Sequence, residues 1–237
     1  MCVKFIAVAI ALLACSPASA APDASVALFN GKNSAGWTYH LEKPDVKPSD
    51  VWSVKDGVLR CTGTPTGYLI TKESNFENFK LSLDWRWPGK GGNNGVLVHV
   101  TKPSELGVWP KSFEVQLQEG TAGELWVIGT TLEIKHPSTH IDDRRHKNIV
   151  TGAEKPLGQW NTMEITCRGK EIEVKVNGYL VNQATSLSQQ RGAIALQSEG
   201  TPIEYRNITL TKLPVMRGPN AQQPAGNRGP NVRRPQR

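Results

Sequence analysis

The segment 171–181, EIEVKVNGYLV, decides the fold class of this chain. Its first half alternates charged residues with apolar ones up to Val176, and a period of two is the pattern of a β-strand with one buried face. Asn177 and Gly178 follow at once, and an Asn-Gly pair supplies the positive φ angles that a two-residue hairpin turn requires. The segment is therefore predicted to be a β-hairpin.

Short runs rich in Val, Ile, Thr, Trp and Leu recur along the rest of the chain, with turn residues between them. They are VWSV (51–54), GVLRC (57–61), GYLIT (67–71), FKLSLDWRW (79–87), GVLVHV (95–100), SFEVQLQ (112–118), LWVIG (125–129), WNTMEITCR (160–168), GAIALQ (192–197) and IEYRNITLTK (203–212). After residue 25, apolar residues nowhere hold a period of 3.6 for three turns, which argues against an α/β fold. The pattern predicts an all-β protein built as one sandwich domain.

The N-terminal residues 1–20 have the composition of a secretory signal peptide. Lys4 precedes an apolar run from Phe5 to Ala14, and Ala18-Ser19-Ala20 has the small-x-small form of a cleavage site. We therefore expect a secreted or periplasmic protein. In the alternative reading, the four residues ending at Cys15 resemble a lipobox, and acylation of Cys15 would make the protein a membrane-anchored lipoprotein. No later segment approaches the roughly 20 apolar residues that a membrane span needs.

Residues 214–237 consist of Pro, Gly, Asn, Gln and Arg with almost no apolar content, so we expect this tail to be disordered. The tail also carries much of the positive charge. The chain has a net charge of +7, but five arginines follow Leu213 and one lysine lies in the signal segment, which leaves +1 for the domain. Nucleic acid is therefore not an expected partner. The domain is expected to be a monomer.

Two cysteines, Cys61 and Cys167, remain after the signal segment, and an exported protein meets conditions in which disulfides persist. We predict that they form a bridge; the alternative is two separate buried thiols.

No C-x-x-C spacing supports a zinc site. Within the irregular stretch 119–159, a cluster of imidazoles and carboxylates resembles a divalent-metal site: His136, His140, Asp142, Asp143 and His146. Because that stretch is a loop whose spacing fixes no geometry, a solvated loop is the preferred interpretation, and no cofactor is expected.

Strand alternation assigns the side chains of SFEVQLQ to two faces. Phe113 and its apolar neighbours point to the core, while Glu114, Gln116 and Gln118 point away from it. Such a row is well suited to hold sugar hydroxyls. An ordinary glycosidase uses two carboxyls across the scissile bond. This strand offers only one, so a laminarinase-like double displacement on it is disfavoured.

The same alternation places further polar residues opposite apolar ones. Asp84 and Arg86 lie opposite the core-facing residues of LSLDWRW, and His99 lies opposite Val98 and Val100. We expect these three to line one concave face together with Glu114 and Gln116. Two tryptophans outside the predicted core are candidates to stack on sugar rings: Trp109 and Trp126.

Five motifs, in order, resemble the 3-keto-disaccharide hydrolase family, formerly a domain of unknown function. They are LFNGKNSAGW (28–37), GGNNGVLVHV (91–100), SFEVQLQ (112–118), LGQWNTMEI with EIEVKVNG (157–178) and ALQSEGTPIEYRNITL (195–210). The likeness covers residues 27–213. It implies a concanavalin- or laminin-G-like jelly-roll sandwich and an exported protein that cleaves glycosides oxidised at C3. Family members often carry Asn-Ser-Gly and an Arg where this chain has Asn93-Asn94-Gly95 and His99.

The chemistry implied by this resemblance needs one well-placed acid or base. A ketone at C3 acidifies the C2 hydrogen, so a base removes it, the aglycone leaves C1 by elimination, and water adds. Glu114 is then the expected base or acid. The remaining expected roles are stabilisation of the enediolate by Arg86, His99 and Arg206, and substrate contact by Asp84, Gln116, Gln118, Trp109, Trp126 and Glu199. The competing functions are a non-catalytic carbohydrate-binding module of the cell envelope and a structural envelope protein.

Overall fold

The computed structural model describes residues 25–215. The predicted signal peptide, the alternative lipidation site Cys15 and residues 216–237 of the predicted tail lie outside the described residues. Helix in the described part is confined to α1 (Pro48–Val51) and one 3-10 turn (Pro137–Thr139). Neither is long and apolar enough to cross a membrane.

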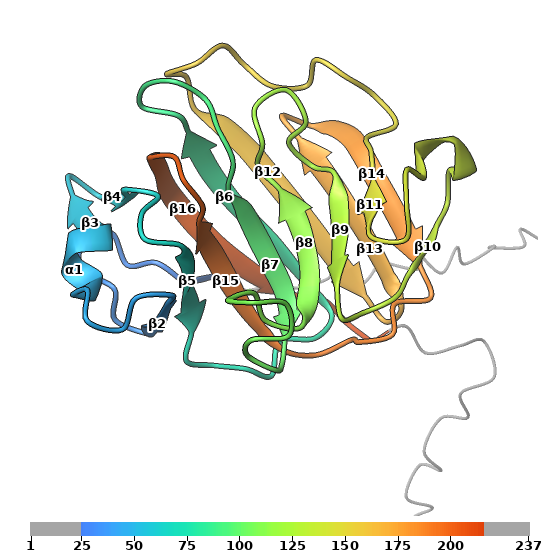
Figure 1. Ribbon diagram of the computed structural model, residues 1–237. Coiled ribbons are helices and arrows are strands. Elements are labelled where there is room, and N and C mark those ends of the chain that lie inside the picture. The colour runs from blue at the N-terminus through green and yellow to red at the C-terminus, as the bar shows by residue number, and fades with distance from the viewer. Residues whose placement is uncertain (1–24, 216–237) are drawn as a thin grey trace, which may run out of the picture.

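Two antiparallel sheets face each other as layers, and β7, β8 and β9 are the green strands toward the viewer in Figure 1. Sheet A has nine strands: β10 (Glu133–Ile134), β14 (Tyr179–Thr185), β13 (Glu171–Val176), β12 (Asn161–Arg168), β6 (Phe79–Arg86), β16 (Ile203–Lys212), β4 (Val58–Cys61) and β3 (Trp52–Lys55) in spatial order, with β1 (Ser25–Ala27) on β16. Sheet B has seven: β11 (Arg145–His146), β9 (Leu125–Ile128), β8 (Ser112–Gln116), β7 (Gly95–Val100), β15 (Ala193–Ser198), β5 (Gly67–Thr71) and β2 (Trp37–Leu41). The predicted all-β sandwich is confirmed.

The hairpin predicted at 171–181 is formed by β13 and β14. Asn177 and Gly178 have φ angles of 50° and 84°, as the tight turn requires. Val176 pairs with Tyr179 across the turn, and β13 continues in register against β12. Local turn chemistry therefore fixes the pairing beside the turn, and a shift between Val174 and Lys175 then changes the register of β13 on β14.

The main core lies between the two sheets. In β6, buried Phe79, Leu81, Leu83 and Trp85 alternate with half-buried polar residues, as a one-sided strand requires. Sheet B contributes Val96, Val98, Phe113 and Val115 among others to the same core. Its opposite face, turned away from the core, also carries a small apolar cluster: Tyr68, Leu97, Val100, Ile128, Ala193 and Ala195, with Trp109 packed against it. This outer face of sheet B is where the candidate site lies.

The predicted Cys61–Cys167 bridge is wrong, because both cysteines are free and buried. Cys61 lies on β4 and Cys167 on β12, and β16 and β6 separate these strands in sheet A. Three strand spacings amount to about 14 Å. A disulfide tolerates Cα atoms no more than about 7 Å apart.

Candidate functional site

The strand β8 positions the candidate acid. It runs between β7 and β9, so that Glu114 is paired with Leu97 on one side and Trp126 on the other. Phe113 and Val115 enter the core, as the alternation predicted. Glu114 and Gln116 therefore lie on the outer face of sheet B. Both are nonetheless buried, with exposed fractions of 7% for Glu114 and 4% for Gln116.

A cavity of about 410 Å³ lies on this outer face, and its lining mixes carboxylates, amides, arginines and tryptophans. The lining residues are Asn93, Leu106, Trp109, Glu114, Gln116, Gln118, Trp126, Ile128, Arg144, Arg145 and Glu199. Six of the side chains proposed from the sequence thus surround one cavity: Glu114, Gln116, Gln118, Trp109, Trp126 and Glu199. A polar cavity with aromatic walls of this kind is suited to a sugar ring.

The floor of the cavity depends on Gly95. A side chain there would meet Glu114 Oε1 at 2.8 Å and also the side-chain oxygen of Gln197. The missing Cβ therefore leaves the room in which Glu114 and Gln197 approach each other. Gln197 is 1% exposed, and its Oε1 finds no hydrogen-bond donor among residues 25–215. The contact that the Gln197 side chain makes with Glu114 lowers the pKa of Glu114 and so favours its ionised form.

The electrostatics of the cavity favour the protonated form of Glu114. Burial raises the pKa of Glu114 from 4.5 to about 8, and the negative charge of Glu199 raises it as well. The Gln197 amide and the Arg144 guanidinium oppose these effects without cancelling them. At neutral pH, most Glu114 side chains therefore keep their proton. Burial also raises the pKa of Glu199.

A buried amide fixes the backbone that carries Glu199. Asn94 Oδ1 accepts the backbone N–H of Glu199 at 3.0 Å, and Asn94 Nδ2 donates to the carbonyl of Thr201 at 2.9 Å. Asn93 forms an additional isolated bridge with Gly200. The Asn-Asn-Gly segment, which departs from the resembled motif, thus ties the loop after β15 to the start of β7.

Two arginines that sequence reasoning missed complete the cavity. Arg144 and Arg145 lie 5.9 and 5.4 Å from the ring centroid of Trp126, within the range of a cation–π contact. Arg145 also pairs with buried Glu124, with 2.9 Å between Nε and Oε2. Asp142 accepts hydrogen bonds from the backbone N–H groups of both arginines. The only signal in the sequence was an Arg-Arg pair inside a long loop.

Two histidines of that loop contact each other. His140 and His146 face each other with their Nδ1 atoms 3.4 Å apart. Asp142 is engaged with the loop backbone. Within residues 25–215, no group of three or more His, Cys, Asp or Glu side chains is arranged to hold a metal ion.

The placement of His99 in the site is wrong, because its side chain points into the core. His99 has a φ of 53°, and the register between β7 and β15 shifts beside it. This bulge reverses the alternation, so the ring packs 5.6 Å from Phe79 and 6.3 Å from Phe113. His99 is 1% exposed, and burial lowers its pKa to about 4. A neutral core imidazole cannot stabilise an enediolate in the cavity.

The placement of Asp84, Arg86 and Arg206 in the site is wrong as well. All three belong to β6 and β16 of sheet A, the layer opposite the cavity. There Arg206 Nε pairs with Asp84 Oδ2 at 3.1 Å, and Arg86 Nε pairs with Glu204 Oε2 at 2.7 Å. Both guanidinium groups stack on Trp160, at 4.1 and 4.6 Å from its ring centroid. Strand alternation correctly predicted that these side chains point away from the core, but it could not predict which of the two sheets carries them.

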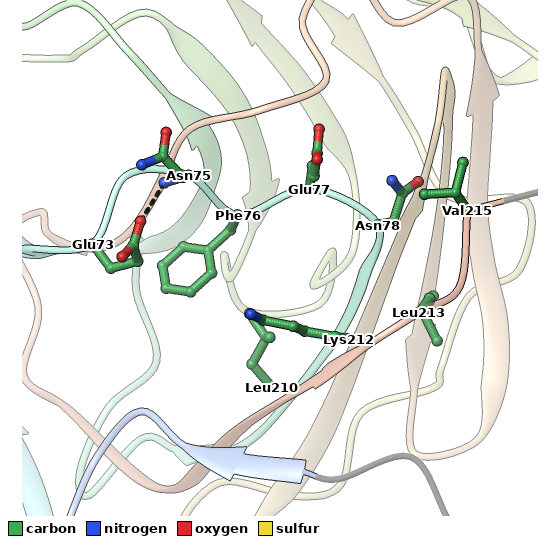
Figure 2. A pocket seen from close by; sticks show the side chains of 9 residues that line it. All are labelled: Glu73, Asn75, Phe76, Glu77, Asn78, Leu210, Lys212, Leu213 and Val215. Atoms are coloured by element: carbon green, nitrogen blue, oxygen red, sulfur yellow. Dashed lines mark hydrogen bonds between the residues drawn. The ribbon is translucent and has the colours of Figure 1, made fainter. Parts of the chain in front are cut away.

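Figure 2 shows a different hollow of about 400 Å³ near the end of β16, lined by Glu73, Asn75, Phe76, Glu77, Asn78, Leu210, Lys212, Leu213 and Val215. Both of its glutamates are exposed. Glu73 accepts the backbone N–H of Asn75 at 2.8 Å, the dashed line in Figure 2, and Glu77 pairs with Arg191. No buried acid faces this hollow, so the cavity at Glu114 is the stronger candidate.

Solved structures share the architecture. A candidate glycosyl hydrolase from Parabacteroides distasonis has 25% sequence identity and a TM-score of 0.59, covering 80% of this chain and 100% of that one. A carbohydrate-binding module from Bacillus subtilis has 10% identity and a TM-score of 0.53, covering 75% and 96%. A β-glucanase from Bacillus licheniformis has 13% identity and a TM-score of 0.53, covering 79% and 97%. The fold is thus a jelly-roll sandwich of the concanavalin type.

No curated protein sequence matches the chain. The sequence profile of the 3-keto-alpha-glucoside-1,2-lyase-like domain matches residues 24–211, which is nearly the whole of the described sandwich. The match agrees with the resemblance drawn from the five motifs. On this profile match, the chain belongs to the 3-keto-alpha-glucoside-1,2-lyase-like domain family.

Proposed function

We propose that the protein is an exported enzyme that cleaves 3-keto-glycosides by removing the C2 proton and eliminating the aglycone from C1, followed by hydration. The observation that carries the proposal is Glu114, a buried carboxyl whose pKa lies at about 8 and which faces a polar cavity. A group that titrates near the working pH serves both as proton donor and as proton acceptor.

The remaining residues of the cavity support sugar binding. Gln116 Oε1 accepts the backbone N–H of Leu117, which leaves the amide N–H₂ of Gln116 as a donor for a hydroxyl. Gln118 is exposed at the rim, and the half-buried rings of Trp109 and Trp126 stand in the walls. Together they offer hydrogen bonds to hydroxyls and apolar surface to the C–H faces of a pyranose.

Arg144 takes the role first given to Arg86, His99 and Arg206. Elimination passes through an enediolate whose negative charge sits on the C3 oxygen. A guanidinium that lines the cavity, and whose charge already acts on Glu114, is suited to stabilise that oxygen. The cation is therefore supplied by the segment between β10 and β11 rather than by sheet A.

Purified protein is tested on 3-keto-disaccharides and on the unmodified disaccharides side by side. We expect cleavage of the 3-keto compounds alone. Glu114→Gln keeps the size of the side chain but replaces the carboxyl with an amide that cannot exchange a proton. Turnover should therefore fall by about 10²–10⁴-fold with little change in KM. Glu164→Gln, which alters a carboxylate paired with Lys80 on sheet A, is the matched control and should keep full turnover.

Two results would overturn the proposal. Binding of sugars without cleavage of any of them identifies a carbohydrate-binding module. Cleavage at an equal rate by wild type and Glu114→Gln shows that Glu114 transfers no proton.

A further inference from the structure

We propose that Glu199 is a second catalytic residue of this reaction: it takes the proton from C2, while Glu114 gives its proton to the leaving oxygen at C1. The inference rests on the proposed function and deepens it by dividing the proton transfers between two carboxyls. The SFEVQLQ strand supplies one of them, and the loop after β15 supplies the other.

The geometry brings both carboxyls to one cavity from different strands. Glu199 follows Gln197 by two positions at the end of β15, and both stand on the outer side of sheet B. The carboxylate of Glu199 has no hydrogen bond or salt bridge to any residue in the range 25–215. Its backbone, by contrast, is held by the buried Asn94 amide. A fixed main chain that presents an unengaged carboxylate to a cavity is the arrangement expected of a group that acts on a ligand.

The difference in burial separates the two roles. Glu114 lies on the floor of the cavity with 7% exposure, whereas Glu199 is half-buried at its side. Removal from water penalises the charged form, so the deeper carboxyl holds its proton more strongly. The charge of Glu199 adds to this effect by raising the pKa of Glu114. When environments separate two neighbouring carboxyls in this way, the ionised one is placed to be the base and the protonated one the acid.

The proton balance closes over the full reaction. Ionised Glu199 takes the C2 hydrogen, and the electrons of the C–H bond form the enediolate with the C3 ketone. The enediolate expels the aglycone as the C1–O bond breaks, and the proton of Glu114 goes to the departing oxygen. Water then adds to C1 of the unsaturated ketone: Glu114, now ionised, takes a proton from the water, and Glu199 returns its proton to C2. Both carboxyls are restored to their starting forms, and one water is consumed.

A comparison of leaving groups tests the division of roles. The substrates are a 3-keto-disaccharide, whose leaving alkoxide must be protonated, and 4-nitrophenyl 3-keto-α-glucoside, whose phenolate leaves without an acid. Glu199→Gln should lose about 10²–10⁴-fold in kcat on both substrates, because both require C2 deprotonation. Glu114→Gln should lose as much on the disaccharide. In the first turnover, however, its release of nitrophenolate should be slowed by less than about 10-fold, because this release precedes the hydration step in which Glu114 acts again. Glu119→Gln, an exposed carboxylate that does not line the cavity, is the control and should keep both rates.

The outcomes are distinguishable. If wild type cleaves the 3-keto compounds and Glu199→Gln keeps its kcat, or changes only KM, then Glu199 is a binding residue and the inference is overturned while the proposed function stands. If the nitrophenyl substrate rescues Glu199→Gln rather than Glu114→Gln, the two roles are reversed and the assignment fails. If wild type cleaves neither 3-keto compound, the proposed function fails and the inference fails with it.

Discussion

Replacing Glu114 by Gln should stabilise the protein at high pH even though it removes activity. The folded state raises the pKa of Glu114 from 4.5 to about 8, mainly by burial. Between these two pH values the folded protein holds a proton that the unfolded chain has released. The stability contributed by this proton is fully present below about pH 4.5 and is lost as pH rises through about 8.

The size of the effect follows from the two pKa values. Each pH unit between them costs about 1.4 kcal/mol of unfolding free energy, so the whole interval is worth about 4–5 kcal/mol. Gln has the same shape and cannot ionise. The unfolding free energy of Glu114→Gln minus that of wild type should therefore grow by about 4 kcal/mol between about pH 5 and pH 8, and then level off.

Urea unfolding followed by tryptophan fluorescence, at unit pH steps, measures this difference directly. Other titrating groups are common to both proteins and cancel in the subtraction. Glu164→Gln, on the outer face of sheet A, should show a constant difference from wild type and serves as the control. A difference for Glu114→Gln that stays flat, or that falls with pH, would refute the buried, protonated state on which the site is built.

Four further outcomes are expected. Asn94→Ala leaves the Glu199 N–H and the Thr201 carbonyl without their buried partner, so unfolding free energy should fall by about 2–4 kcal/mol and kcat on 3-keto substrates should fall with it. Thiol titration of denatured, unreduced protein without its first 20 residues should count two thiols, Cys61 and Cys167. A count of zero would show that a disulfide links the two cysteines. His99→Asn, which tolerates the positive φ, should lose about 1–3 kcal/mol of stability in urea unfolding with kcat kept within about threefold; a larger kcat loss would return His99 to the site. Arg206→Gln should cost less than about 1 kcal/mol and leave kcat unchanged in the same assays, since its ion pair is on sheet A.

Local rules predicted the two faces of the strand that lines the candidate cavity. The period of two in SFEVQLQ placed Glu114 and Gln116 opposite Phe113 and Val115, and β8 has that arrangement. Alternation within a regular strand is fixed by backbone geometry, so no knowledge of neighbours is needed. The Asn177-Gly178 turn was predictable for the same reason, because its φ angles are a property of the two residues.

Alternation failed where pairing with another strand changed the strand itself. His99 follows Val98 in an unbroken apolar run, and nothing in that run marks a bulge. The bulge arises from the register of β7 against β15, and it turns the His99 ring toward Phe113 and Phe79. The positive φ of His99 therefore comes from strand pairing rather than from a local turn motif such as the one at Asn177-Gly178.

The sequence by itself determined the fold class, the hairpin, the inward and outward faces of regular strands and the direction of Glu114 and Gln116 away from the core. Tertiary structure alone decided which strands share a sheet, and so moved Asp84 and Arg206 to the far layer and kept Cys61 away from Cys167. It also brought Glu199 and Arg144, from distant parts of the chain, to the same cavity. The physical reason is that side-chain direction along a strand is a local property, whereas strand order depends on long-range hydrogen bonding and burial.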